Sequence, residues 1–446
     1  MGTPMTEASF FGTEKISRIL LKIAPPVMLA QLIQAMYNIV DSFFVGKYSA
    51  DALTALTVIY PLQLIIIALA VGTGVGVNTY MARKYAQDRA SDADNAAGCG
   101  MVLAAASWLI LMITALLVMR PYVMMSASSE GAINDAVVYG NIVCIGSLGI
   151  FLEGNWTKVL QAEGNMRLPM AAQIIGALVN IVLDPILIFG IGPFPKLGVA
   201  GAAYATVLGQ WTAAVITGVK GFRRPPAFKA MPHYFKKIYF YGYSSIVMQS
   251  LYTVYIFALN VILAGFSDAA VTVLGLYYKW QSFFFIPLFG LETCIVPVLS
   301  YNYACNAFKR CKDIMSKSFL TSAAFMVLGL IAFVFFPEQI ISVFSDSAEV
   351  KEIGRTAFPI IGASFLPAVI SLMMPVFFQA IGDGKTSMFL SFARQIFCLV
   401  PLFWLFSLIG LSYAWIGFPA AETISGAICL LLYYRILRSW GIAQKK

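Results

Sequence analysis

The sequence predicts an all-α polytopic membrane protein with twelve transmembrane helices in two six-helix bundles. Hydrophobic residues make up 60% of the chain and charged residues only 11%, whereas soluble domains contain roughly 25% charged residues. Runs of about 20 mainly apolar residues, each long enough to cross a bilayer as a helix, recur along the whole chain. Alternating segments of about ten residues, typical of transmembrane barrels, do not recur.

The predicted helices are apolar stretches separated by short polar connections. They are residues 20–46, 53–81, 96–119, 133–160, 169–191, 198–221, 238–265, 270–301, 316–337, 350–378, 386–409 and 412–436. Charged residues precede the first stretch, and no signal-peptide pattern is present, so we expect it to remain as an uncleaved anchor. The glycines of residues 71–76 follow no strand and precede no Lys-Ser pair, which indicates close helix packing and not a phosphate loop.

The longest polar connection, residues 222–237, carries five lysines and arginines and three prolines. It follows the sixth predicted helix, at the middle of the chain. We interpret it as a cytoplasmic basic linker between an N-lobe, residues 1–221, and a C-lobe, residues 238–446.

The two lobes repeat one another at an offset of 218 residues. The motif at Gln161–Gly164 recurs at Gln379–Gly382, and Tyr85-Ala86 recurs as Tyr303-Ala304. Because six helices per lobe is an even number, both lobes enter the membrane in the same direction. Two such bundles predict a central cleft that opens to either side in turn, which is the architecture of alternating access.

Most of the 30 lysines and arginines fall in alternate connections. Because positive residues favour the cytoplasmic side, this bias predicts that both termini lie in the cytoplasm. We expect a multi-pass protein of a bacterial inner membrane, in contact with lipids. We therefore attribute the net charge of +9 to the residues that set the orientation in the membrane, and we do not expect nucleic acid as a partner.

The first predicted helix carries a polar face made of Gln34, Tyr37, Asn38 and Asp41. Their spacing of three and four residues places them on one side of a helix. An acid at membrane depth costs roughly 2.5–3.5 kcal/mol, so we expect this face to turn toward protein or water.

The fifth predicted helix supplies a second acid. Asn180 and Asp184 share one face, and Pro185 frees a backbone carbonyl. We predict that Asp41, Asn180 and Asp184 bind a coupling ion, either H⁺ or Na⁺, because two adjacent carboxylates either share a proton or hold a small hard cation. No other metal site is expected. The alternative is a buried structural carboxylate, capped by Tyr37 and Asn180, without a transport role.

Other polar and aromatic residues within the helices have two interpretations each. For Glu153, an interfacial ion pair with Lys158 competes with contact to substrate. The remaining candidates for a substrate cavity are Gln34, Glu292, Tyr277, Trp280 and Phe284, because acids and aromatic faces attract organic cations. We expect Arg394 and Glu422 to pair with each other.

The sequence offers nothing for catalysis. The seven cysteines are scattered, the one histidine, His233, lies in a loop, and no Walker motif is present. We therefore expect no enzymatic activity, no organic cofactor and no use of ATP, and a monomer is the simplest expectation. An intramembrane enzyme is the least favoured class.

Several motifs resemble the multidrug and toxic compound extrusion (MATE) family, on its bacterial DinF or MepA-like side. They span nearly the whole chain. They are MYNIVDSFFVG from Met36, QAEGNMRLPM from Gln161, NIVLDPILIFG from Asn180, LGVAGAAYAT from Leu197, QAIGDGKTSM from Gln379 and AWIGFPAAE from Ala414.

The resemblance implies two lobes in a V shape and export of large organic cations in exchange for protons or sodium ions. It implies an N-lobe cation site at Tyr37, Asn38, Asp41, Asn180, Asp184 and Thr206. It also implies a bend of the first helix at Pro26, and we expect Pro25 and Pro26 together to let this helix bend. The NorM branch has acids in the seventh and tenth helices that this chain lacks. The alternative function is a lipid-linked oligosaccharide flippase of the same superfamily, which we disfavour because the expected cavity is acidic.

Overall fold

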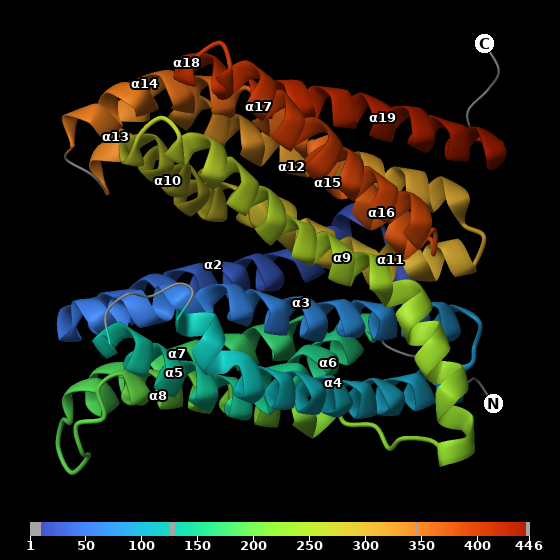
Figure 1. The fold of residues 1–446 in the computed structure, drawn as a ribbon. Helices are drawn as coiled ribbons and strands as arrows, with labels where there is room; N and C mark the ends of the chain where they lie inside the picture. Colours follow the sequence, from blue (N-terminus) through green and yellow to red (C-terminus); the bar gives the residue numbers. More distant parts are fainter. Residues whose placement is uncertain (1–9, 125–129, 345–346, 443–446) are drawn as a thin grey trace. The chain divides into compact units, whose positions relative to one another are not determined.

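A computed structural model describes residues 10–124, 130–344 and 347–442, without the side chains at 38, 39, 42, 50, 53, 57 and 268. Every regular element in these ranges is helical (Figure 1). Nine helices are long and apolar enough to cross a membrane, or up to twelve if each of three bent pairs is one span. The predicted fold class is therefore confirmed.

The chain forms two compact units. The first contains Met1–Phe10 and Pro25–Ile246, and the second contains Phe11–Ala24 and Val247–Lys446. The division falls inside two long helices, α2 and α9, so each of these helices contributes residues to both units. The predicted linker, residues 222–237, lies within the first unit, where helix α9 already begins at Met231.

The helices that begin in the first half of the chain are α1 (Phe10–Thr13), α2 (Ile16–Tyr48), α3 (Ala50–Ala86), α4 (Ala90–Met124), α5 (Glu130–Gly146), α6 (Leu148–Ala162), α7 (Arg167–Phe189) and α8 (Val199–Gly221). A 3-10 turn, η2 (Phe228–Ala230), precedes α9 (Met231–Ala264).

The second half continues with α10 (Asp268–Phe284), α11 (Ile286–Ala304), α12 (Phe308–Phe335), α13 (Pro337–Ser342), α14 (Ala348–Gly362), α15 (Phe365–Ala380), α16 (Gly384–Phe392), the π-helical η3 (Ala393–Leu399), α17 (Val400–Ser407), α18 (Leu411–Ala414) and α19 (Gly417–Ser439).

The repeat at 218 residues extends to the bounds of the helices. Helix α3 corresponds to α10 and α11 together, and α8 corresponds to α19, with the same first and last positions. A serine caps the start of both α3 and α10, at Ser49 and Ser267. Asp88 and Asn306, 218 residues apart, both adopt a positive φ, at 55° and 56°. Asp and Asn tolerate this left-handed conformation better than most residues, so the same turn is built twice.

Three of the predicted spans are broken. The bends are 42° between α5 and α6, 54° between α10 and α11, and 55° between α14 and α15. At two of the breaks a serine hydroxyl donates back to the helix, from Ser147 to the carbonyl of Cys144 at 2.8 Å and from Ser364 to that of Ile361 at 2.6 Å. Such bonds compete with the helical ladder and bend it.

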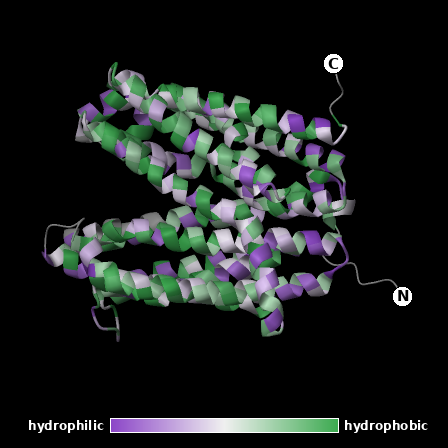
Figure 2. Ribbon diagram, turned by 45° about the vertical axis from the view of Figure 1, so that its right-hand side comes forward, coloured by the Kyte–Doolittle hydropathy of each residue, from purple (hydrophilic) through white to green (hydrophobic). Residues whose placement is uncertain are grey.

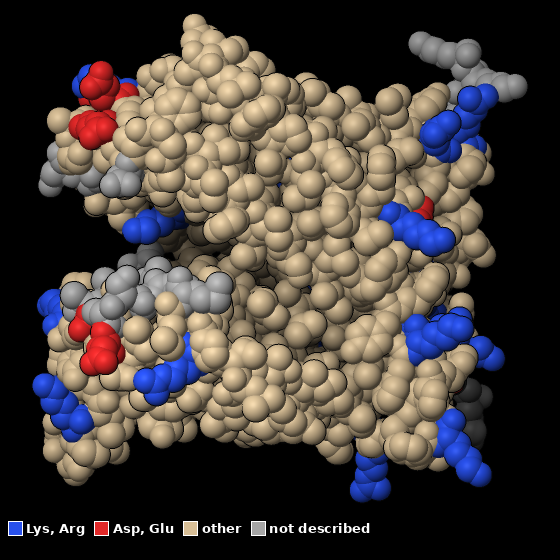
Figure 3. Space-filling view, viewed as in Figure 1, with Lys and Arg blue, Asp and Glu red and all other residues tan. Residues whose placement is uncertain are grey.

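Apolar residues run along the helices, and hydrophilic residues gather mainly toward helix ends (Figure 2). On the face seen in Figure 3, lysine, arginine, aspartate and glutamate lie over the helix ends, and the middle of each unit is free of them. Exposed side chains along the helices, such as Leu117 at 76% and Val215 at 62%, are apolar. This is the surface expected of helices that face lipid.

Candidate functional site

The two predicted acids of the first unit lie together. Asp41 on α2 is 8% exposed and Asp184 on α7 is fully buried. Their carboxyl groups are within hydrogen-bonding reach of each other. The Nδ2 of Asn180 donates to Asp184 Oδ1 at 3.3 Å and to Thr206 Oγ1 at 3.4 Å. Four predicted site residues from three helices therefore form one cluster.

Close approach of α7 and α8 positions this cluster. A Cβ at Gly176 would lie 2.6 Å from the carbonyl oxygen of Gly209, and one at Gly209 would lie 2.7 Å from that of Gly176. Only glycine allows this spacing, because any side chain would hold the helices apart. The contact places Asn180 of α7 against Thr206 of α8, about one turn away.

Three buried oxygen atoms of the cluster accept no hydrogen bond from the described residues. They are Oδ1 of Asp41, Oδ1 of Asn180 and Oδ2 of Asp184. Leaving a buried acceptor unsatisfied costs roughly 1–3 kcal/mol. Two ionised carboxylates cannot satisfy each other, because neither carries a hydrogen to donate. A proton on one carboxyl would let it donate to the other, and a small cation between them would be coordinated by several of these oxygens.

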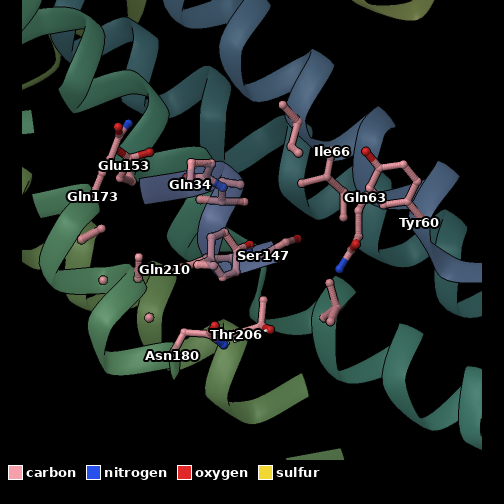
Figure 4. A pocket seen from close by; sticks show the side chains of 18 residues that line it. Gln34, Tyr60, Gln63, Ile66, Ser147, Glu153, Gln173, Asn180, Thr206 and Gln210 are labelled. Carbon is pink, nitrogen blue, oxygen red and sulfur yellow. Dashed lines mark hydrogen bonds between the residues drawn. The ribbon is translucent and has the colours of Figure 1, made fainter. Parts of the chain in front are cut away.

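A cavity of about 170 Å³ adjoins the cluster, within the first unit. Asn180 and Thr206 lie at one edge of it, and Glu153 and Gln173 lie together at another (Figure 4). The Glu153 carboxylate accepts from Thr157 Oγ1 at 2.7 Å and from Gln173 Nε2 at 3.4 Å. The predicted residues Gln34 and Tyr37 also line the cavity.

The other residues predicted in the first unit lie on α2 and α6. Pro25 and Pro26 lie inside α2, at the point where this helix passes from the second unit to the first. Lys158 donates from Nζ to Gln161 Oε1 at 3.0 Å. The side chain of Asn38 lies outside the described residues.

Sequence reasoning missed residues on α3, α5 and α8. Gln63 donates from Nε2 to the hydroxyl of Tyr139 at 3.2 Å, and that hydroxyl also bonds Thr206 and lies within electrostatic reach of Asp41. Tyr60 and Gln210 line the cavity as well. A glutamine or tyrosine inside an apolar helix is a weak signal, because neither carries a charge that demands a partner.

The predicted residues of the second unit are separate from this cluster. Tyr277, 3% exposed, packs edge-on against Phe333 and Phe418. Trp280 donates from Nε1 to the Ile340 carbonyl at 3.1 Å and packs against Phe284. These contacts are those of an aromatic core, and a substrate role for the three rings stays a prediction.

Glu292, Arg394 and Glu422 form a group of charged residues within the second unit. The Arg394 guanidinium donates to both carboxylate oxygens of Glu422 at 2.7–3.0 Å, which confirms the predicted pair. The charge of Arg394 also acts on Glu292, whose Oε1 accepts no hydrogen bond from the described residues.

Comparison with known proteins places the chain in a family. The model of the MatE family matches residues 26–186 and 244–405. An FAD transporter of Shewanella oneidensis is 25% identical over 434 residues, covering 94% of this chain and 95% of the relative. The probable multidrug resistance protein NorM of Thermotoga maritima is 25% identical over 441 residues, covering 94% and 92%.

The fold is that of solved transporters as well. The structure of an outward-facing multidrug resistance MATE family transporter superposes with a TM-score of 0.91 at 22% identity, covering 99% of this chain and all of the other. The family model covers well over half of the sequence, on both sides of its midpoint. The chain belongs to the MatE family of membrane transporters.

Proposed function

We propose that this protein exports organic, mostly cationic and amphipathic compounds in exchange for protons or sodium ions that enter the cell. The observation that carries the proposal is the set of three buried oxygens on Asp41, Asn180 and Asp184 that the described residues leave without a hydrogen-bond donor. Such a set of oxygens binds a small cation. Neutralising either acid removes negative charge that attracts the cation.

Both candidate ions fit this arrangement. A proton would let one carboxyl donate to the other, which removes the repulsion of two charges in a low-dielectric site. Sodium would find a set of oxygen ligands only, which is what hard cations prefer. Within the described residues, no group of three or more His, Cys, Asp or Glu is arranged to hold a metal, and this favours a monovalent ion over a transition metal.

The cavity supports a role in ion passage more than in holding the drug. Its volume of about 170 Å³ is below the roughly 300–1,000 Å³ of typical ligand pockets. That volume has room for an ion with several waters. Larger cargo would require the cavity to widen or another part of the protein to bind it.

The charge of the cavity bears on any cargo that the cavity would admit on widening. The relatives include proteins named for multidrug resistance and one named for FAD. The described lining contains an acid, Glu153, and neither lysine nor arginine. A flavin dinucleotide carries a diphosphate that requires basic partners, so we favour organic cations over anions.

Energetics limit the stoichiometry. Exporting one positive charge against 100 mV and a hundredfold gradient costs about 5 kcal/mol. One ion entering down the same potential and a tenfold gradient releases about 3.7 kcal/mol. A cationic cargo under these conditions therefore needs two ions, and two acids in one cluster allow for them.

We further propose an inner-membrane monomer with both termini in the cytoplasm, which works by alternating access.

The test replaces each acid by its neutral isostere. Asp41→Asn and Asp184→Asn should each abolish energy-dependent efflux of ethidium from cells that lack other exporters, with unchanged amounts of protein in the membrane. Asp88→Asn is the matched control, because Asp88 is exposed and the repeat places asparagine at the equivalent Asn306. Efflux retained in either acid variant would refute the coupling role.

Proteoliposomes with the pH gradient and the sodium gradient imposed separately identify the ion. We expect one gradient alone to drive dye movement in the wild type and in Asp88→Asn. Movement driven by neither gradient would overturn ion coupling altogether.

A further inference from the structure

A second pocket, in the second unit, has no place in the proposed transport reaction. It has a volume of about 530 Å³ and lies between the start of α2 and the start of α12. Four basic residues line it: Lys15, Arg18, Arg310 and Lys317. Asp313 is the acid in the described lining.

Contacts to neutral groups fix two of these cations in place. Arg310 donates from Nη2 to the carbonyls of Phe11 at 3.0 Å and Glu14 at 2.9 Å, and from Nε to Asn302 Oδ1 at 3.0 Å. Lys317 donates from Nζ to the hydroxyl of Ser17 at 2.8 Å. These partners orient the positive groups without neutralising them. The pocket therefore keeps a net positive potential despite Asp313.

Arg18 is an exposed cation of this pocket. It pairs with Glu14 at 3.0 Å, but the side chains are 72% and 41% exposed. An exposed pair of this kind is worth about 0–1 kcal/mol. An incoming anion can thus engage Arg18 at little cost.

Apolar side chains lie next to the basic groups. Leu21 lines the pocket and is 75% exposed, and Leu320, about one turn beyond Lys317 on α12, is 74% exposed. Both helices run from their charged starts into apolar sequence, so these leucines lie deeper in the membrane than the cations. Basic groups above and apolar groups below match the headgroup and the acyl chains of a phospholipid.

The first unit provides a contrast. A basic pocket there is lined by Arg83, Lys84 and Arg89, among other residues. However, Arg83 lies over the ring of Tyr241, and Lys84 and Arg89 lie 3.8 Å and 3.9 Å from Asp92. These three cations are engaged with a ring or an acid, whereas Arg310 and Lys317 between α2 and α12 are held by neutral groups.

We propose that the pocket between α2 and α12 binds the phosphate of an anionic phospholipid, with Arg18, Arg310 and Lys317 around the headgroup and Leu21 against the acyl chain. Basic pockets between transmembrane helices are known to bind lipid headgroups in this way. A bound lipid would tie the start of α2 to α12 within the second unit.

The test measures binding of dioctanoyl phosphatidylglycerol to the purified full-length protein by native mass spectrometry. The double variant R18Q/K317Q should bind about thirty-fold more weakly, because each basic residue near an anionic surface contributes a factor of about five. The control K229Q/K236Q should bind like the wild type. It removes two exposed lysines outside the pocket, and Lys236 is the repeat equivalent of Arg18. Equal melting temperatures of the two double variants show that folding is intact.

Further binding measurements distinguish recognition of a lipid from recognition of free phosphate and from nonspecific association. Leu21→Ser should weaken binding of the lipid and leave binding of glycerol phosphate unchanged. Equal lipid binding by the two double variants would overturn the proposal. So would equal binding of dioctanoyl phosphatidylcholine, or glycerol phosphate bound as tightly as the lipid.

Discussion

The buried ion pair of the second unit makes a quantitative prediction about stability. Arg394 and Glu422 are 6% and 3% exposed and share three contacts of 2.7–3.0 Å. The hydroxyl of Ser371 donates to the same carboxylate. Arg394 lies in the π-helical turn η3, which aims its side chain at α19. Removing one partner of such a pair leaves an uncompensated buried charge, at a cost of roughly 3–5 kcal/mol.

Glu422→Gln should therefore lower the free energy of unfolding by about 3 kcal/mol, the lower end of that range. The value is at the lower end because the Arg394 charge also reaches Glu292, which offers a second acid. Adding Glu292→Gln removes that acid and should increase the loss. The paired replacement R394M/E422L removes both charges and should lie within about 1 kcal/mol of the wild type, since apolar replacement of a whole ion pair is often neutral.

The assay is equilibrium unfolding of the purified protein in mixed detergent and SDS micelles, combined with ethidium efflux in cells. The single variants R394M and E422L complete a double-mutant cycle with R394M/E422L, which isolates the energy of the pair. We expect R394M/E422L to fold and to export dye. A Glu422→Gln variant as stable as the wild type would refute the reasoning. So would a stably folded R394M/E422L variant that exports nothing, because the pair would then act in transport and not only in structure.

Two further predictions concern the first unit. Gly76→Ala should destabilise the protein by about 1–3 kcal/mol, because its Cβ would overlap the Ile238 carbonyl where α3 meets α9. The control Gly275→Ala meets nothing within 4 Å and should stabilise by about 0.5–1 kcal/mol; equal melting temperatures would contradict this packing. Burial raises the pKa of Glu163, although Arg223 at 2.5 Å pulls it down. The folded-state pKa thus lies above the unfolded one, so ionisation of Glu163 disfavours the fold as pH rises. Glu163→Gln should become more stable relative to the wild type as the pH rises above about 4, near the unfolded-state pKa, and the opposite trend in melting temperature would contradict this.

The sequence was sufficient to find the cluster of acids because charge inside an apolar helix is costly. Asp41 and Asp184 each lie in such a helix, and their requirement for a partner predicts that they meet. Tyr139 and Gln63 carry no charge, so only the packing of α3 against α5 reveals them beside Thr206. The rings of residues 277–284 show the converse difficulty. An aromatic run that attracts cations has the same composition as one that fills a core.

Helix ends and breaks were less predictable, for different reasons. Hydropathy marks where a helix leaves the membrane and not where the helix ends. Helix α3 continues past its predicted end at residue 81, through Arg83 and Lys84, to Ala86. The break between α5 and α6 contains no proline. It depends on the Ser147 hydroxyl turning back to its own helix, which is a choice of side-chain conformation that sequence patterns do not encode.

The internal repeat explains why the two units carry different chemistry on the same scaffold. At the positions equivalent to Asp41, Asn180 and Asp184, the second half has Leu259, Cys398 and Leu402. In turn, Arg394 and Glu422 stand where the first half has Gly176 and Tyr204. Each unit thus encloses an ionic cluster within its helices. The second unit satisfies Glu422 with the fixed guanidinium of Arg394, which cannot leave. The first has two acids and no basic side chain in hydrogen bond with either among the described residues. On our proposal, that arrangement leaves the positive charge to be supplied, and removed again, by an ion from outside.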